Sequence, residues 1–271
     1  MKDHARELDK VAGRTDWEGV CKHEELGRPL VHDRLAIMLH RLKGASADDL
    51  DVFAALIGET RVISVGQVLV NEGSRPQISM ILLEGFVGRV SILSEGGRQI
   101  SGLHVPADFV DLHSLLLKKM DHSLVALTDV AVAAVSHADL RRVCETRPHL
   151  MRALWRETVV DGAIHRKWLS ALGRRLAAER LALLFCELYV RLNAVGLAAD
   201  YRFDLPLTQS DVADMVGITP VHVNRSLKAL RQQGLVEWRG RAAIIRDWRN
   251  LAGFAQFDPT YLEARLTTEW V

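Results

Sequence analysis

Cysteine is scarce in this chain of 271 residues: Cys21, Cys144 and Cys186 lie far apart, and no Cys-x-x-Cys pair occurs. This spacing excludes a disulfide scaffold and a zinc or iron–sulfur cluster held by closely spaced thiolates. Because free thiols are typical of a reducing compartment, we expect a cytoplasmic protein.

The chain also lacks a long apolar run. The two most apolar stretches, residues 123–135 and 176–190, are interrupted by charged residues, so neither offers about 20 consecutive apolar positions. We therefore predict no membrane span and no membrane partner. Residues 1–14 alternate charges around no apolar centre, and we expect no secretory signal peptide there.

An excess of one charge sign is missing as well. Lys and Arg number 35 against 34 Asp and Glu, which gives a formal net charge of +1. Binding to nucleic acid would therefore have to come from a local basic patch. A hydrophobic content of 48% and a charged content of 25% are ordinary for a globular protein and exclude a disordered chain.

The spacing of apolar residues divides the chain into regions. Short runs of Val, Ile and Leu, separated by Gly and Pro turns, predict an all-β barrel or sandwich. From residue 136 the period becomes helical, with a long helix after Pro148 and a second helix over 174–193. Short helices are expected at 33–42 and 47–56. The expected strands are 61–65, 67–70, 79–83, 87–93, 99–104 and 124–135.

The last third of the chain carries the most specific pattern. Thr208 is a good N-cap for a short helix that ends at Gly217, and Thr219 with Pro220 begins a second helix that ends at Gly234. A hairpin is expected next. Helix, glycine-containing turn, helix and hairpin is the winged helix-turn-helix pattern of DNA-binding proteins.

The charge of this region agrees with that interpretation. Residues 219–249 hold seven basic residues and two acidic ones, although the whole chain is almost neutral. Such a local concentration of positive charge is what the neutralisation of DNA phosphates requires. A solvated charged face on an ordinary helix pair is the less favoured interpretation.

Residues 207–235 resemble the DNA-binding unit of the Crp/Fnr transcription regulators. Residues 66–73, 81–92 and 105–111 resemble the cyclic-nucleotide-binding β-roll of the same family. The resemblance implies an α+β fold with a β-roll or jelly-roll domain, a dimerisation helix and a winged helix-turn-helix domain. The predicted boundaries are a polar extension at 1–32, the β-roll sensor-like domain at 33–147, the dimerisation helix at 148–172, the DNA-binding domain at 173–250 and a tail at 251–271.

The resemblance also implies which residues contact DNA. The second helix of the motif would enter the major groove, where Arg225 could pair with guanine. Pro220 and Val221 stand where the cyclic-AMP receptor has charged base-reading residues, so a different target sequence is expected. Lys228 and Arg239 are added on charge alone. The full predicted set is Gln209, Ser210, Thr219, Pro220, Val221, His222, Arg225, Lys228, Arg239, Gly240 and Arg241.

The expected effector pocket departs from the family pattern. A cyclic-nucleotide site in this family needs a Gly–Glu pair and an Arg–Ser pair, whereas the first pair here reads Ala107-Asp108. An aspartate would repel a cyclic phosphate, and the second region has no arginine, so cyclic AMP binding is not expected. An unknown small-molecule effector, or none, stays open. The predicted pocket residues are Ala107, Asp108, Met120, Asp121, His122 and Ser123.

The family implies a homodimer that binds double-stranded DNA at a palindrome, with RNA polymerase as a further partner if the protein activates transcription. The dimer seam, which is the set of apolar residues that would contact a second copy, is expected along the long helix. We predict no enzyme activity, no catalytic residue, no metal and no cofactor. The predicted seam residues are Leu150, Met151, Leu154, Val159, Val160, Ala163, Ile164, Trp168, Leu169 and Leu172.

Two other functions are weighed against this prediction. The first is a β-roll that binds a ligand or partner beside a degenerate DNA-binding domain. The second is a cupin-like metal enzyme, but His104 lacks the paired histidine and glutamate that such a site needs. Lone histidines near the β-roll, namely His104, His113 and His122, are interpreted as structural residues rather than haem ligands.

Overall fold

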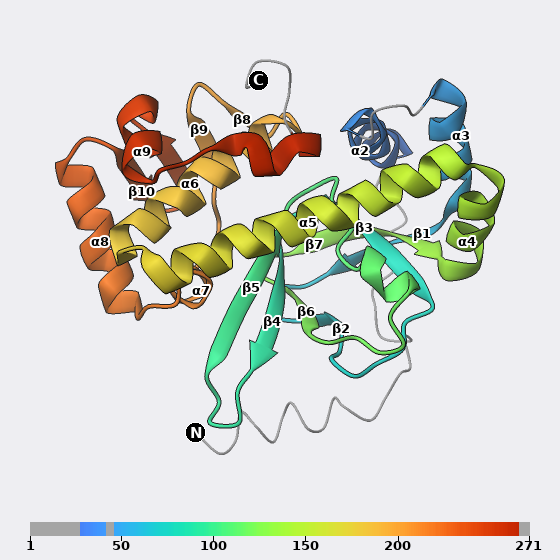
Figure 1. Ribbon diagram of the computed structural model, residues 1–271, viewed down its shortest axis with the longest axis horizontal. Helices are drawn as coiled ribbons and strands as arrows, with labels where there is room; N and C mark the ends of the chain where they lie inside the picture. The colour runs from blue at the N-terminus through green and yellow to red at the C-terminus, as the bar shows by residue number, and fades with distance from the viewer. Residues whose placement is uncertain (1–27, 42–45, 266–271) are drawn as a thin grey trace.

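The computed structural model describes residues 28–41 and 46–265. Most of the predicted extension 1–32 lies outside these residues, and the first helix among the described residues, α2 (Arg28–Arg41), begins within the remainder. A β-roll packs under one half of a long central helix, and the C-terminal elements surround its other half (Figure 1). No helix in the described ranges is long and apolar enough to cross a membrane.

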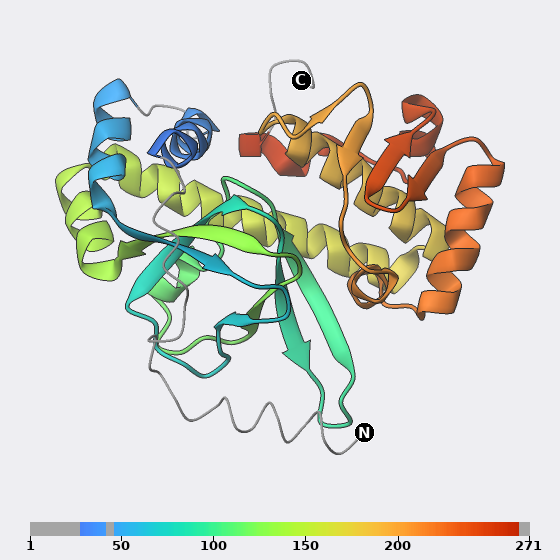
Figure 2. The same ribbon diagram turned by 180° about the vertical axis from the view of Figure 1, so that it is seen from behind.

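The β-roll consists of two antiparallel sheets, with strand orders β1-β7-β3 and β2-β6-β4-β5. Figure 2 shows the roll from behind, below the long helix. A one-turn helix, η1 (Leu112–Leu115), follows the second sheet's outer strand. The strands are β1 (Ile57–Ile63), β2 (Val68–Val70), β3 (Ile78–Glu84), β4 (Val87–Ile92), β5 (Arg98–His104), β6 (Ser123–Ala126) and β7 (Val130–Ser136).

The prediction of one strand over 124–135 is wrong. The chain leaves β6 at Ala126, turns, and enters β7 at Val130 in the other sheet. In the turn, the backbone N–H of Leu127 donates to the carbonyl of Phe86 at 2.9 Å. The two strands are both apolar because the inner faces of both sheets contribute to the core. The sequence pattern therefore does not reveal the turn between β6 and β7.

The long helix α5 (Pro148–Arg174) runs the length of the molecule (Figure 1). It packs against the β-roll and the short helices α3 (Ala47–Leu56) and α4 (His137–Thr146) at its start. Beyond Arg175 the chain turns back into α6 (Ala177–Asn193), whose core-facing residues are almost all buried. The α5 and α6 bounds agree with the predicted helices to within three residues at each end.

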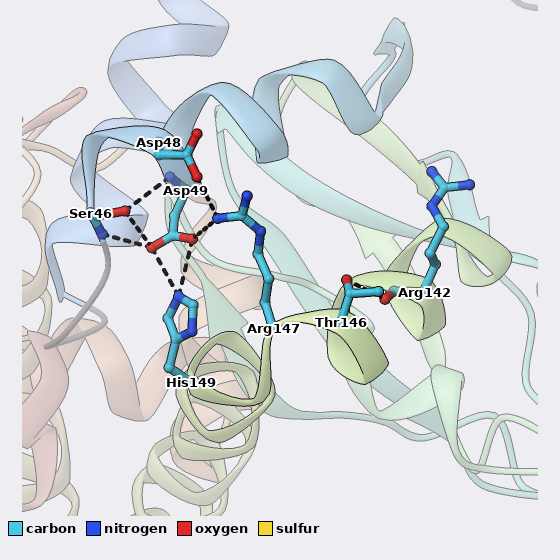
Figure 3. A network of polar contacts seen from close by, with 7 residues as sticks. All are labelled: Ser46, Asp48, Asp49, Arg142, Thr146, Arg147 and His149. Atoms are coloured by element: carbon cyan, nitrogen blue, oxygen red, sulfur yellow. Dashed lines mark hydrogen bonds and ion pairs between the residues drawn. The ribbon is translucent and has the colours of Figure 1, made fainter.

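A polar network fixes α3 on the start of α5 (Figure 3). Ser46 and Asp49 form a capping box, and the Asp49 carboxylate also accepts from Arg147 at 2.7 Å and from His149 at 3.0 Å. Burial alone raises the pKa of Asp49, but hydrogen bonds from Ser46, His149 and Arg147 outweigh it and hold the pKa well below its usual range.

The C-terminal region combines a small sheet, of order β10-β11-β9-β8, with the helix pair α7–α8. The described part of the predicted tail, residues 251–265, packs on α6 and α5, and the hydroxyl of Tyr261 donates to Glu187 of α6 at 2.7 Å. The elements are β8 (Ala198–Ala199), β9 (Arg202–Asp204), α7 (Gln209–Val216), α8 (Pro220–Gln232), β10 (Val236–Arg239), β11 (Ala242–Ile245), α9 (Trp248–Phe254) and η2 (Pro259–Arg265).

Candidate functional site

Local capping chemistry defines the helix pair α7–α8. The Thr208 hydroxyl accepts from the Asp211 N–H at 3.0 Å, and the Asp211 carboxylate accepts from the Thr208 N–H, also at 3.0 Å. Helix α7 ends at Gly217, which has a φ of +63° that a side chain would strain. Thr219 then caps α8 through the His222 N–H at 3.3 Å. All expected signals of the helix-turn-helix are therefore in place.

Helix α8 has one buried and one exposed face. Val223 and Leu230 are fully buried against α6 and α7, whereas Val221 is 76% exposed and Arg225 is exposed beside it. Asn224 donates from its amide to Gln209 of α7 at 2.5 Å, which links the exposed surfaces of the two helices. The exposed face is thus anchored to its own domain by the buried face of α8 and by this hydrogen bond.

The hairpin β10–β11 adds a second exposed basic element. Its turn places Arg239, Gly240 and Arg241 at an exposed tip, and β10 packs against α8. All eleven residues predicted to contact DNA are exposed in the structure. They lie on the starts of α7 and α8, on the outer face of α8 and at the tip of the hairpin.

Comparison with known proteins agrees with this geometry. Residues 179–254 match the Crp-like helix-turn-helix domain, and residues 60–147 match the cyclic nucleotide-binding domain. The chain belongs to the Crp/Fnr family of DNA-binding transcription regulators. It is 27% identical over 195 residues to the transcriptional activator protein FnrL of Cereibacter sphaeroides, covering 70% of this chain and 78% of the relative.

Two further relatives cover similar shares of this Crp/Fnr regulator. The nitrogen fixation regulation protein FixK of Bradyrhizobium diazoefficiens is 29% identical over 208 residues, covering 77% of this chain and 82% of FixK. The solved structure of FixK2 from Bradyrhizobium japonicum superposes with a TM-score of 0.66 at 25% identity, covering 72% of this chain and 96% of FixK2. The whole two-part architecture is therefore shared.

The regulator has a cavity of about 420 Å³ between the β-roll and α5. Among the residues predicted for the effector pocket, Asp121 and His122 line it. Its wall consists of Arg89, Ser91, Ser101, Phe109, Leu112, His113, Leu117, Asp121, His122, Glu157, Thr158, Asp161, Gly162, His165 and Arg166.

The other predicted pocket residues lie elsewhere. Ala107 is buried, and Asp108 beside it binds Arg191 of α6 at 2.8 Å. Met120 is buried in the core of the roll, and the Ser123 hydroxyl accepts from the Glu72 N–H at 3.0 Å. None of these four side chains lines the cavity: Asp108 links the roll to α6, and the other three lie in the core of the roll or against a neighbouring turn.

Charged groups in the cavity are mostly paired. Arg89 donates to Asp161 of α5 at 2.7 Å, so this guanidinium of the cavity wall already has a carboxylate partner. Burial and the charge of Arg89 lower the pKa of His122 to about 4, and the same causes lower the pKa of His113. Both imidazoles are therefore neutral at pH 7.

The outer side of α5 carries an exposed apolar stripe. The stripe residues are exposed by 44% at Met151, 68% at Trp155, 51% at Val159 and 63% at Leu169. At 100° per residue they fall on one side of the helix, together with Gly162. Five of the residues predicted for the dimer seam instead face the chain's own core; these are Leu150, Leu154, Val160, Ile164 and Trp168.

A hairpin of the β-roll reaches the DNA-binding domain. Arg98 of β5 donates to Asp214 at 2.6 Å and to Asp211 at 2.7 Å, both on α7. Gln99 adds a bond from its side-chain amide to the Asp214 carbonyl at 2.6 Å. The sequence offered no signal for these contacts, because the partners lie more than a hundred residues apart.

Proposed function

We propose that this chain acts as a homodimer that binds a palindromic DNA site, with one α8 in the major groove of each half-site. The observation that carries the proposal is the exposed and basic face of α8 beside the basic hairpin tip. A guanidinium can pair with both acceptors of a guanine edge, and Arg225 has the exposed position for this role. The residues at the helix starts and at Arg239, Gly240 and Arg241 would contact phosphates.

The proposed dimer forms through the stripe on α5. Four large apolar side chains on one helical side are a surface that water solvates poorly, and a second copy of the same helix would cover them. A twofold dimer that binds a palindrome would need its two reading helices about 34 Å apart, one turn of DNA. RNA polymerase becomes a partner if the protein activates transcription, and the proposed location is the cytoplasm.

Sedimentation of the purified protein tests the dimer. Trp155→Asp places a charge in the middle of the stripe, and we expect it to shift the wild-type dimer to monomer. Val65→Asp is the matched control, since Val65 is 60% exposed but lies in a turn of the β-roll. A monomeric wild-type protein, or a dimeric Trp155→Asp variant, would contradict the proposal that the stripe on α5 forms the dimer interface.

The reading role of Arg225 has its own test. Arg225→Ala should reduce the preference for the target over unrelated DNA by roughly 1–3 kcal/mol. Arg239→Ala should weaken binding to both DNAs equally, since a phosphate contact carries no sequence information. An unchanged preference in Arg225→Ala would sink the assignment.

We also propose that cyclic AMP is not the effector. Three carboxylates, those of Asp121, Glu157 and Asp161, line the cavity against two guanidinium groups, and Arg89 is bound to Asp161. A cyclic phosphate would have to displace that ion pair and approach the remaining carboxylates. Millimolar cyclic AMP should leave the melting temperature unchanged, and a saturable calorimetric isotherm would reverse this conclusion.

A further inference from the structure

Two histidines and an aspartate that are distant from the DNA-binding surface come together in the cavity wall. His113 belongs to η1, while Asp121 and His122 directly precede β6. One ligand atom from each side chain lies within 4.8 Å of the other two. The two imidazole rings have their centroids 5.0 Å apart.

The imidazole nitrogens of this cluster are incompletely satisfied. His122 is 6% exposed, and its Nδ1 lies 2.8 Å from Oδ1 of Asp121. The Nε2 atoms of His113 and His122 are both buried, and neither has a hydrogen-bond partner among the described residues. Buried nitrogen atoms are normally paired, so two unpaired ones in the same cavity wall call for a ligand.

Charge and protonation favour a cation as that ligand. The carboxylates that line the cavity outnumber its guanidinium groups, as described above. Because burial and Arg89 lower the pKa values of His113 and His122, both rings keep a free lone pair at neutral pH. A neutral imidazole is the form that coordinates a metal.

We propose that His113, Asp121 and His122 bind one divalent transition-metal ion of the zinc, iron or cobalt class. Two imidazoles and a carboxylate are typical ligands for these ions, whereas calcium and magnesium prefer oxygen ligands alone. Ligand atoms around a tetrahedral zinc ion are about 3.3 Å apart, given bonds of about 2.0–2.1 Å. The observed cluster therefore has to contract by roughly 1.5 Å at its widest separation, and the Asp121 carboxylate has to exchange its contact with Nδ1 of His122 for the ion.

The position of the site indicates how an ion would enter it and which segments a bound ion would connect. The Asp121 side chain is 70% exposed, so an ion can enter from solvent, while His122 closes the inner side. The ligands lie at the two ends of the segment 113–122. The bound ion would cross-link η1 to the start of β6 and hold this segment against the cavity.

Titration of untagged, metal-free full-length protein with Co²⁺ tests the site, with visible ligand-field absorption as the signal. We expect one Co²⁺ per chain and a more than tenfold loss of affinity in His113→Gln and in His122→Gln. His165→Gln is the matched control, because His165 lines the same cavity from α5 but lies outside the cluster. Equal affinity in wild type, His113→Gln and His122→Gln would overturn the proposal, as would the absence of saturable binding to wild type.

Asp121→Asn covers the case in which a buried histidine variant does not fold. Asp121 is exposed, so the variant should keep the metal-free melting temperature of wild type. Addition of Zn²⁺ should raise the melting temperature of wild type and leave that of Asp121→Asn almost unchanged. An equal rise in both would contradict the site. Neither measurement involves DNA, so the result is independent of the function proposed above.

Discussion

Arg191 of α6 donates to Asp108 of the β-roll at 2.8 Å, and both side chains are at least 99% buried. The same guanidinium donates to the Leu103 carbonyl at 2.8 Å and to Glu187 at 3.1 Å. Glu187 in turn accepts from Trp168 of α5 at 3.0 Å. A buried polar network thus joins the sensor-like β-roll, the long helix and the helix that supports the DNA-binding domain.

Loss of this network should cost much of the stability. Arg191→Met leaves two buried carboxylates without their cation, and we expect the free energy of unfolding to fall by roughly 3–5 kcal/mol. Arg142→Ala, which removes an exposed ion pair within α4, should cost about 0.5 kcal/mol or less. Chemical denaturation measures both, and an equal loss in the two variants would refute the network's role.

The contact of Arg98 with α7 should require the planar fork of an arginine. Arg98→Ala should speed amide exchange at the β4–β5 tip and in the first turn of α7 roughly fivefold, or about 1 kcal/mol. Arg98→Lys should behave like the alanine variant, since an ammonium group cannot reproduce the two-pronged contact. Arg75→Ala, on an exposed loop, serves as control. Exchange at the wild-type rate in Arg98→Ala would rule out the coupling.

Alanine substitutions at two glycines with the same backbone conformation distinguish the cost of backbone strain from the cost of steric crowding. Gly85 and Gly66 have φ values of +82° and +83°, but a Cβ at Gly85 would lie 2.3 Å from the Asp129 carbonyl oxygen, whereas at Gly66 it meets nothing within 4 Å. Gly66→Ala should cost about 1–2 kcal/mol from backbone strain alone. Gly85→Ala should cost roughly 1–3 kcal/mol more. Thermal unfolding compares them, and equal losses would contradict this packing of the β3–β4 turn.

The Asp49 network predicts a dependence of stability on acid. The folded pKa of Asp49 lies below its unfolded value of about 3.9, so its stabilisation is present above that pH and is lost as pH falls toward the folded pKa. Asp49→Asn should cost roughly 1–3 kcal/mol at pH 7. This deficit should shrink when unfolding is measured at successively lower pH from 5 to 2. A deficit that stays constant would contradict the assignment, and Asp51→Asn, exposed on the same helix, is the control.

The features predicted best from the sequence are those that a short stretch of chain determines. The α7 bounds were predicted to the residue, because Thr208 and Gly217 are local signals of a helix start and end. The break between β6 and β7 escaped prediction, because both strands are apolar and the turn carries no glycine or proline. The partner of Asp108 lies 83 residues away, so no local pattern could reveal that the carboxylate faces Arg191.

The long helix shows a second limit of sequence patterns. Its apolar residues were predicted to form a dimer seam, but those at Leu154 and Ile164 are buried in the chain's own core. Trp155, which was not in the predicted seam, is the most exposed apolar residue of the stripe. An amphipathic pattern shows that a helix has apolar residues on a face. Only the packing of the fold shows which of two apolar faces contacts the chain's own core and which is exposed.

Selection of random double-stranded DNA by the purified wild-type protein, without added ligand, tests whether the protein binds a palindrome as a dimer. We expect enrichment of an inverted repeat whose half-sites are centred one DNA turn apart, 10–10.5 base pairs or about 34–36 Å. The same selection with Arg225→Ala should lose information at one position in each half-site. Enrichment of an asymmetric site, or of no sequence at all by a correctly folded protein, would show that the protein does not read a palindrome as a dimer.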